Sequence, residues 1–118
     1  MLNVLSLFDW MSCGQLALKN LNIEVDSYFS SEIDKFAIQV TQNNFPNTIQ
    51  VWDVTKIKWE DYKDITLLYW GSPCQWFSFA WKQLAFDDPR SKLFFEFVRL
   101  VKQLKPKYFL LENVKMKI

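Results

Sequence analysis

Two residues of this 118-residue chain have the chemistry of a nucleophile and an acid. Cys74 follows Pro73 in Gly-Ser-Pro-Cys-Gln, a polar, turn-forming stretch that is untypical of a core. Glu112 ends the apolar run of LLENV, where partial desolvation would favour its protonated form. A thiolate needs positive or dipolar surroundings, and no histidine is present to supply them, so the substrate would have to assist. Alternatively, Cys74 is a packing residue and Glu112 is a structural acid satisfied by backbone amides.

Two further acidic residues have positions typical of nucleotide sites. Glu32 ends a strand-like run downstream of Gly14, where an acid can accept hydrogen bonds from ribose hydroxyls. Asp53 ends another such run and could accept a hydrogen bond from an adenine amino group. In the alternative interpretation, Glu32 caps the helix that follows and Asp53 is a turn residue. The pattern alone leaves both interpretations open.

The elements that must position these residues follow from the hydrophobic pattern. Strands are predicted at residues 3–8, 25–29, 49–52, 65–70 and 108–111. Helices are predicted at residues 14–21, 34–43 and 92–104, with a loop or short helix at 56–64 and a long loop at 71–90. This order predicts an α/β fold with a parallel sheet and helices on both faces. Ligands bind such sheets beyond the carboxyl ends of the strands, so the strand-end residues Asp9, Glu32, Asp53, Cys74 and Glu112 should meet at one edge.

The composition fits one domain with a buried core. Half of the residues are hydrophobic, and 14 Lys and Arg against 13 Asp and Glu give a formal charge of +1. That charge provides no global attraction to nucleic acid or to a membrane. No apolar run approaches the roughly 20 residues of a membrane helix. No signal peptide is visible, and two distant cysteines predict a reduced, cytoplasmic chain. The absence of histidine excludes an imidazole base and histidine-ligated metals.

Six segments together resemble the DNA (cytosine-5) methyltransferases, in order and in approximate spacing, over essentially the whole chain. They are Phe8-Asp9-Trp10, Glu32, Asp53-Val54, Gly71-Ser72-Pro73-Cys74-Gln75, Arg90-Ser91-Lys92-Leu93 and Glu112-Asn113-Val114. The Pro-Cys-Gln and Glu-Asn-Val elements are highly specific as a pair, whereas the cofactor elements would fit many S-adenosylmethionine enzymes. The resemblance implies a partial Rossmann-like methyltransferase fold of about five strands.

The resemblance also implies a role for each matching residue. S-adenosylmethionine would be bound by residues from several strand ends, namely Phe8, Trp10, Met11, Glu32, Ile33, Asp53, Val54, Pro73 and Leu93. Cys74 would be the nucleophile, and Glu112 would hold the target base. Three residues would approach the DNA, namely Gln75, Ser78 and Asn113. No metal is implied.

The implied activity is transfer of a methyl group from S-adenosylmethionine to C5 of cytosine in double-stranded DNA. It would proceed through a covalent cysteine–C6 adduct on a base flipped out of the duplex. A monomer is expected, and a cognate restriction endonuclease is a candidate partner. Residues 1–118 would be a partial catalytic domain without a target-recognition domain, and two arginines, Arg90 and Arg99, leave phosphate binding thin. Two alternatives stay open: a non-catalytic cofactor-binding remnant or interaction module of the same fold, and an unrelated nucleotide-binding domain with a redox cysteine.

The chain has 2 glycines and 6 tryptophans, which is an unusual balance. Average usage of roughly 7% would give about eight glycines. In the sequence pattern of the family that the chain resembles, or in close variants of that pattern, glycine stands where this chain has tryptophan. These positions are Trp10, Trp52, Trp70, Trp76, Trp81 and, less firmly, Trp59. Tryptophan there should cost roughly 1–2 kcal/mol where the backbone is left-handed and roughly 1–3 kcal/mol where it overpacks. We hypothesise that UGA codons meant as glycine have been read as tryptophan. The alternatives are a degenerate gene remnant and aromatic residues that stack on bases.

Overall fold

The structure, a computed structural model, describes residues 1–71 and 89–112, and the side chains of 89–91 are not among the parts described. Within these ranges five strands form one sheet in the order β3-β2-β1-β4-β5, and every neighbouring pair is parallel. The strands are β1 (Leu2–Leu7), β2 (Val25–Ser31), β3 (Ile49–Gln50), β4 (Leu67–Gly71) and β5 (Tyr108–Glu112). The predicted parallel α/β sheet is therefore confirmed.

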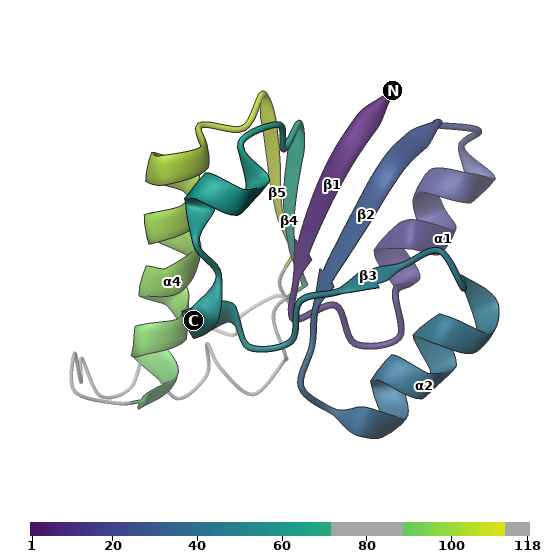
Figure 1. Ribbon diagram of the computed structural model, residues 1–118, viewed down its shortest axis with the longest axis horizontal. Helices are drawn as coiled ribbons and strands as arrows, with labels where there is room; N and C mark the ends of the chain where they lie inside the picture. Colours follow the sequence, from purple (N-terminus) through teal and green to yellow (C-terminus); the bar gives the residue numbers. More distant parts are fainter. Residues whose placement is uncertain (72–88, 113–118) are drawn as a thin grey trace, which may run out of the picture.

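Helices cover both faces of this sheet, as Figure 1 shows. On one side lie α1 (Cys13–Asn20) and α2 (Lys35–Asn44). On the other side lie α4 (Pro89–Leu104) and two short 3₁₀ helices, η1 (Val54–Lys56) and η2 (Trp59–Tyr62). The chain runs outward from β1 to β3 and then returns to β4 on the other side of β1. In open sheets such a reversal of strand order marks the place where ligands bind.

Several boundaries differ from those predicted, for local reasons. Of the predicted strand at 49–52, only Ile49 and Gln50 pair with β2, because Trp52 has a φ of 54° that an extended strand does not allow. Strand β4 begins at Leu67 rather than at residue 65. Helix α4 begins three residues earlier than predicted, at Pro89, because proline is well suited to a first helical position. Most of the loop predicted at 71–90 lies outside the described residues.

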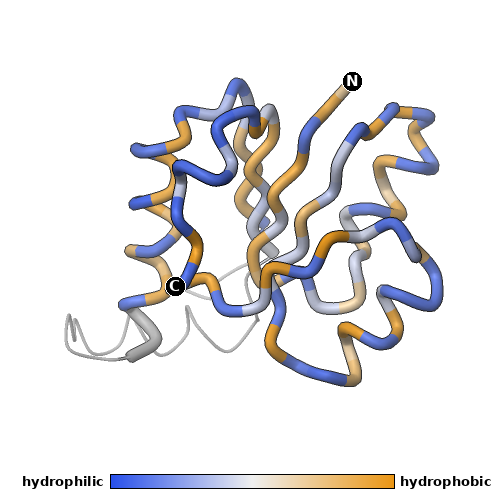
Figure 2. Tube along the Cα trace, in the orientation of Figure 1, coloured by the Kyte–Doolittle hydropathy of each residue, from blue (hydrophilic) through white to orange (hydrophobic). Residues whose placement is uncertain are grey.

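The hydrophobic core lies between the central strands and α4. Leu5, Leu68 and Leu100 are fully buried. The buried positions of α4 are spaced at i, i+3 and i+7, which is the pattern of a helix with one apolar face. Figure 2 shows hydrophobic residues along the central strands and hydrophilic residues on the outer turns of the helices. In the part of the chain that the structure describes, no helix is both long and apolar enough to cross a membrane.

Candidate functional site

The carboxyl ends of the strands collect four acidic residues at one edge of the sheet, as the parallel order requires. Asp9 and Glu32 follow β1 and β2, Asp53 follows β3, and Glu112 ends β5. Strands β1 and β2 are in register up to their last residues, and so are β4 and β5. The predicted meeting of acidic residues at this edge is therefore confirmed for the four that lie within the described ranges.

Glu32 is held at the end of β2 by backbone amides. Its Oε2 accepts a hydrogen bond from the N–H of Trp10 at 2.9 Å, which links the end of β2 to the turn after β1. Its Oε1 accepts from the N–H groups of Ile33 and Asp34, both at 3.1 Å. The cap of α2 is Asp34, whose side chain accepts from two amides of the first turn. The alternative in which Glu32 caps the helix is therefore wrong, and its carboxylate faces the turn between β1 and α1.

That turn is built around a buried carboxylate, Asp9, which is 5% exposed. Four hydroxyl groups donate hydrogen bonds to its two oxygens, from Ser6, Ser12, Tyr28 and Ser30. Burial, followed by the nearby Asp9 carboxylate, raises the pKa of Tyr28 far above its ordinary value, so this phenol stays a donor. The sequence analysis named Asp9 only as a strand-end residue and missed this cluster. The signal in the sequence that could have indicated this cluster is the presence of serines and a tyrosine at buried positions of otherwise apolar strands.

The backbone of this turn is left-handed at three alternate residues. Phe8, Trp10 and Ser12 have φ values of 54°, 52° and 61°. The Thr41 hydroxyl of α2 donates to the Trp10 carbonyl at 3.4 Å. Next to the turn, α1 approaches β4 closely at Gly14, where a Cβ atom would lie 2.7 Å from Cε1 of Tyr69. A glycine is therefore required at this crossing, and it brings the turn close to both central strands.

Asp53 is a turn residue, and the side chain of the next residue, Val54, points into the core. Asp53 caps η1, and its Oδ1 accepts hydrogen bonds from the hydroxyl and the N–H of Thr55 at 2.7 and 2.9 Å. The bond from the Thr55 hydroxyl and, to a smaller extent, the bond from the Thr55 N–H hold the pKa of Asp53 below its ordinary value. Val54 is 4% exposed and its side chain belongs to the core, and its predicted role in holding the adenine edge stays a prediction.

The other predicted cofactor residues differ in exposure. Phe8 packs against Trp70, with ring centroids 5.6 Å apart. Ile33 is 76% exposed beside Glu32, and Met11 is also exposed. Leu93 is half-buried against the core. Ile33 therefore offers an apolar surface to a ligand, whereas Leu93 contributes to packing.

Glu112 lies at the same edge but on the outermost strand. Its Oε2 accepts a hydrogen bond from the Tyr69 hydroxyl at 2.7 Å. Burial first, and then this bond, raises the pKa of Tyr69 well above its ordinary value, which keeps its hydroxyl protonated. The expected desolvation of Glu112 is wrong, because every residue of β5 is exposed. The sequence analysis did not identify Tyr69, which lies in the middle of an apolar run and gives no distinct signal.

Several predicted residues lie outside the described ranges: Pro73, Cys74, Gln75, Ser78 and Asn113. Arg99, one of the two arginines considered for phosphate binding, is already engaged. Its guanidinium contacts Glu96 at 2.6 Å and donates to the carbonyls of Ile57 and Val54. Arg99 therefore joins α4 to the segment around η1, and we correct its role to a structural one.

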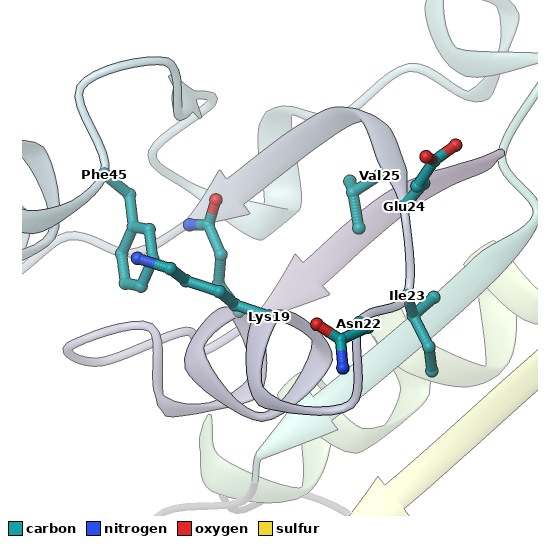
Figure 3. Close-up of a pocket in the computed structure, with 7 residues that line it drawn as sticks. Lys19, Asn22, Ile23, Glu24, Val25 and Phe45 are labelled. Carbon is teal, nitrogen blue, oxygen red and sulfur yellow. The ribbon is translucent and has the colours of Figure 1, made fainter.

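The acidic edge offers Glu32 as a hydrogen-bond acceptor for a hydroxylated ligand. Among the described residues, no group of three or more His, Cys, Asp or Glu could hold a metal. A carboxylate has about four acceptor positions, and three N–H groups occupy most of those of Glu32, which leaves room for a hydroxyl donor. A separate pocket of about 410 Å³ lies near the start of β2, and the ammonium of Lys19 is 6.0 Å from the centre of the Phe45 ring there. Figure 3 shows these two side chains among the residues that line it. That pocket is away from the acidic edge.

Comparison with known proteins decides the family. A family model described as C-5 cytosine-specific DNA methylase matches residues 2–117. The chain belongs to this family. The type II methyltransferase M1.ScrFI of Lactococcus lactis subsp. cremoris is 53% identical over 92 residues, which are 78% of this chain and 23% of the relative. The type II methyltransferase M.NgoBV of Neisseria gonorrhoeae is 43% identical over 98 residues, 83% of this chain and 23% of that protein.

Solved structures support the same fold for this C-5 cytosine-specific DNA methylase chain. A mutant of DNMT2 from Spodoptera frugiperda superimposes with a TM-score of 0.77 and 25% identity, over 98% of this chain and 36% of that one. The chain thus spans about a quarter of the length of the two curated relatives and about a third of that structure. The predicted Rossmann-like methyltransferase fold is confirmed.

Proposed function

We propose that this chain supplies the cofactor edge and the catalytic residues of an enzyme that methylates C5 of cytosine in DNA. The observation that carries the proposal is the Glu32–Trp10 hydrogen bond of 2.9 Å, which fixes an acceptor for hydroxyl groups at the carboxyl edge of the sheet. Glu112 lies at the same edge on β5. Membership in the family and these two carboxylates together support methyl transfer.

S-adenosylmethionine would supply an activated methyl group. Glu32 would accept a hydrogen bond from a ribose hydroxyl at its remaining acceptor position, since three backbone N–H groups already fix the carboxylate in place. The exposed Ile33 would pack against the adenine, and the Asp53 carboxylate would accept a hydrogen bond from the adenine amino group. Phe8, Trp10, Met11, Pro73 and Leu93 complete the proposed set, with Val54 contributing through its backbone.

The chain's own catalytic groups would be Cys74 and Glu112. The Cys74 thiolate would add to C6 of cytosine, which makes C5 nucleophilic enough to take the methyl group. Glu112, oriented by Tyr69, would act in its protonated form: it would donate its proton to N3, accept a hydrogen bond from the exocyclic amine and so offset the negative charge that develops on the ring. Methyl transfer to C5 would leave S-adenosylhomocysteine. Loss of the C5 proton to water acting as a base would then break the sulfur–C6 bond, release the methylated cytosine and restore the Cys74 thiolate.

The substrate would be double-stranded DNA with the target cytosine flipped out of the helix, because C6 is inaccessible in the stack. Gln75, Ser78 and Asn113 are the proposed DNA contacts. The names of the relatives, type II methyltransferases, support a modification system that includes a restriction endonuclease. We propose that the protein acts as a monomer.

Trapping the covalent adduct tests the nucleophile. The chain, incubated with S-adenosylmethionine and duplex DNA carrying 5-fluorocytosine, should form a denaturant-resistant complex, because fluorine at C5 blocks the final elimination. Cys74→Ala should abolish the complex. Cys13→Ala is the matched control, since Cys13 is a free, exposed cysteine at the start of α1. An adduct that survives Cys74→Ala, or none with the unaltered chain, would contradict the proposal.

Titration calorimetry with S-adenosylmethionine tests the cofactor edge separately. Glu32→Gln removes the charge that strengthens the ribose hydrogen bond, so we expect binding about 10- to 100-fold weaker. Asp34→Asn is the control, because this neighbouring acid caps α2 and makes no bond toward the turn. Equal affinity for the Glu32 variant and the unaltered chain would remove Glu32 from the site. Cofactor binding without any DNA adduct would instead favour a non-catalytic cofactor-binding module.

A further inference from the structure

Two tryptophans at the acidic edge have a backbone conformation that tryptophan disfavours. Trp10, in the turn after β1, has a φ of 52°, and Trp52, just beyond β3, has a φ of 54°. Both values lie in the left-handed region, where the Cβ of an L-residue crowds the following carbonyl oxygen. Glycine has no Cβ and adopts this region freely, whereas a bulky residue there is an outlier.

The surroundings impose this conformation on both residues. The Trp10 N–H donates to Glu32 and its carbonyl accepts from the Thr41 hydroxyl. The Trp52 carbonyl accepts a hydrogen bond of 2.7 Å from the Ser31 hydroxyl at the end of β2. Each backbone is therefore held from outside the residue, and a different side chain at these positions would meet the same φ.

Neither indole gains enough burial to compensate for that conformation. Trp10 is 55% exposed and Trp52 is 61% exposed. In contrast, Trp59 in η2 has a negative φ, packs against the core, and lies 5.9 Å below the ammonium of Lys63. Trp70 in β4 is 1% exposed and stacks on Phe97 at 5.0 Å between ring centroids. The structure thus separates two tryptophans that pack in the core from two that are exposed on a left-handed backbone, although the buried indole nitrogen of Trp70 has no hydrogen-bond partner among the described residues.

We infer that positions 10 and 52 are glycine in the protein that the native cell makes, and that their codons are UGA read there as glycine. Some genetic codes assign UGA to glycine and others to tryptophan, so one translation table exchanges the two residues throughout a gene. The count of 2 glycines and 6 tryptophans is the composition that such an exchange leaves. The edge beside Glu32 would then present bare backbone to a ligand. The inference rests on backbone geometry and stands whether or not the chain transfers methyl groups.

Two direct observations test it. Sequencing of the gene should show UGA at codons 10 and 52, and peptide mass spectrometry of the protein from its native cells should show glycine at both positions. A UGG codon or a tryptophan-containing peptide at either position would overturn the inference there. Codons 59 and 70, where tryptophan packs in the core, show whether the exchange extends beyond these two positions.

A stability experiment on this chain tests the backbone argument independently of any gene. Trp10→Gly and Trp10→Ala both remove the indole, but only glycine relieves the left-handed strain. Relief of that strain should raise the folding equilibrium constant about 5- to 30-fold. The greater freedom of glycine in the unfolded chain should lower the same constant about 2- to 5-fold. We therefore expect the folding equilibrium constant of Trp10→Gly to be several-fold higher than that of Trp10→Ala, and the same order for the two variants at Trp52.

The matched control is the same pair of substitutions at Trp59, where φ is negative. There the alanine variant should be the more stable of the two, because glycine brings only its entropic cost. Urea denaturation of the six variants measures these differences. A reversal of sign between position 59 and positions 10 and 52 supports the inference, and alanine equal to or better than glycine at 10 and 52 overturns it.

Discussion

The two parts of the sheet treat their acidic residues differently. In the first part, formed by β1, β2 and β3 with α1 and α2, Asp9 accepts from four hydroxyl groups and Glu32 from three backbone amides. In the second part, formed by β4, β5 and α4, Glu112 accepts a hydrogen bond from Tyr69 and is exposed. The first part fixes its carboxylates before any ligand arrives, and the second leaves its carboxylate open to solvent.

The same contrast extends to the hydrophobic residues. The second part contributes half of the buried core cluster, including Trp70, Phe97 and Leu100 between β4 and α4. Its outer strand nevertheless exposes large apolar side chains, since Phe109 is 60% and Leu110 is 55% exposed. A preorganised site loses little entropy when it binds, whereas an open one must be completed by what it contacts. In the proposed function, the first part would recognise the nucleoside with groups that are already fixed, while the chemistry proposed for the second part would require further contacts.

The largest effect should come from removing Asp9, on which the first part depends. Asp9→Ala leaves four hydroxyls without their buried acceptor, so we expect the free energy of unfolding to fall by about 2–4 kcal/mol. Asp9→Asn keeps one acceptor oxygen and should lose roughly half as much. Urea denaturation measures both. Asp26→Ala, at an exposed acid on β2, should stay within about 0.5 kcal/mol. Equal losses at the two positions would contradict the preorganisation of the first part.

Much of the fold could be predicted from the sequence, because its signals are local. Continuous apolar runs and the alternation of strands and helices predicted a parallel sheet, and strand order was then enough to bring Asp9, Glu32 and Asp53 to one edge. Boundaries were less accurate where backbone conformation decides them. Trp52 ends β3 early because its left-handed φ breaks the strand, and no hydrophobic pattern reports a φ.

The contacts of the site depend on register and on edge position, which the sequence does not state. Asp9 meets Tyr28 and Ser30 because β1 and β2 pair in parallel, so the cluster appears once the strands are aligned. Glu112 was expected to be desolvated because its strand is apolar, but β5 lies at the edge of the sheet. Val54 was assigned to a ligand, although burial below α4 places it in the core.

A smaller effect should appear at alkaline pH, where each part of the sheet contributes one tyrosine. The pKa values of Tyr28 and Tyr69 are raised in the folded state, both chiefly by burial. Unfolded tyrosines ionise near pH 10 while these two stay neutral, so their stabilisation is present below about pH 10 and is lost as the pH rises further. Because both folded pKa values lie above the pH range in which unfolded tyrosine ionises, each tyrosine should contribute about the same slope, with a limit of about 1.4 kcal/mol per pH unit.

Phenylalanine variants separate the two contributions. Urea denaturation from about pH 8 to about pH 11 should show a flatter decline for both Tyr28→Phe and Tyr69→Phe, by about the same amount. Tyr108→Phe, on the exposed strand β5, is the control. If only Tyr28→Phe flattened the decline, Tyr69 would ionise in the folded protein as readily as in the unfolded one, and the second part would be more open to solvent than the Tyr69–Glu112 hydrogen bond indicates.

The smallest effect concerns Asp53, at the outer end of the first part. Its pKa is lowered, first by the Thr55 hydroxyl and then by the Thr55 N–H, so its stabilisation is present above the ordinary aspartate range and is lost as the pH falls through the lower folded value. Thr55→Val removes the hydroxyl and keeps the N–H, so the pKa of Asp53 should move part of the way back. NMR titration of the Asp53 carboxyl carbon measures this, and Thr55→Ser should restore the lower value. An unchanged pKa in Thr55→Val would show that hydroxyl groups fix Asp9 but not Asp53, which would limit the preorganised part of the sheet to β1 and β2.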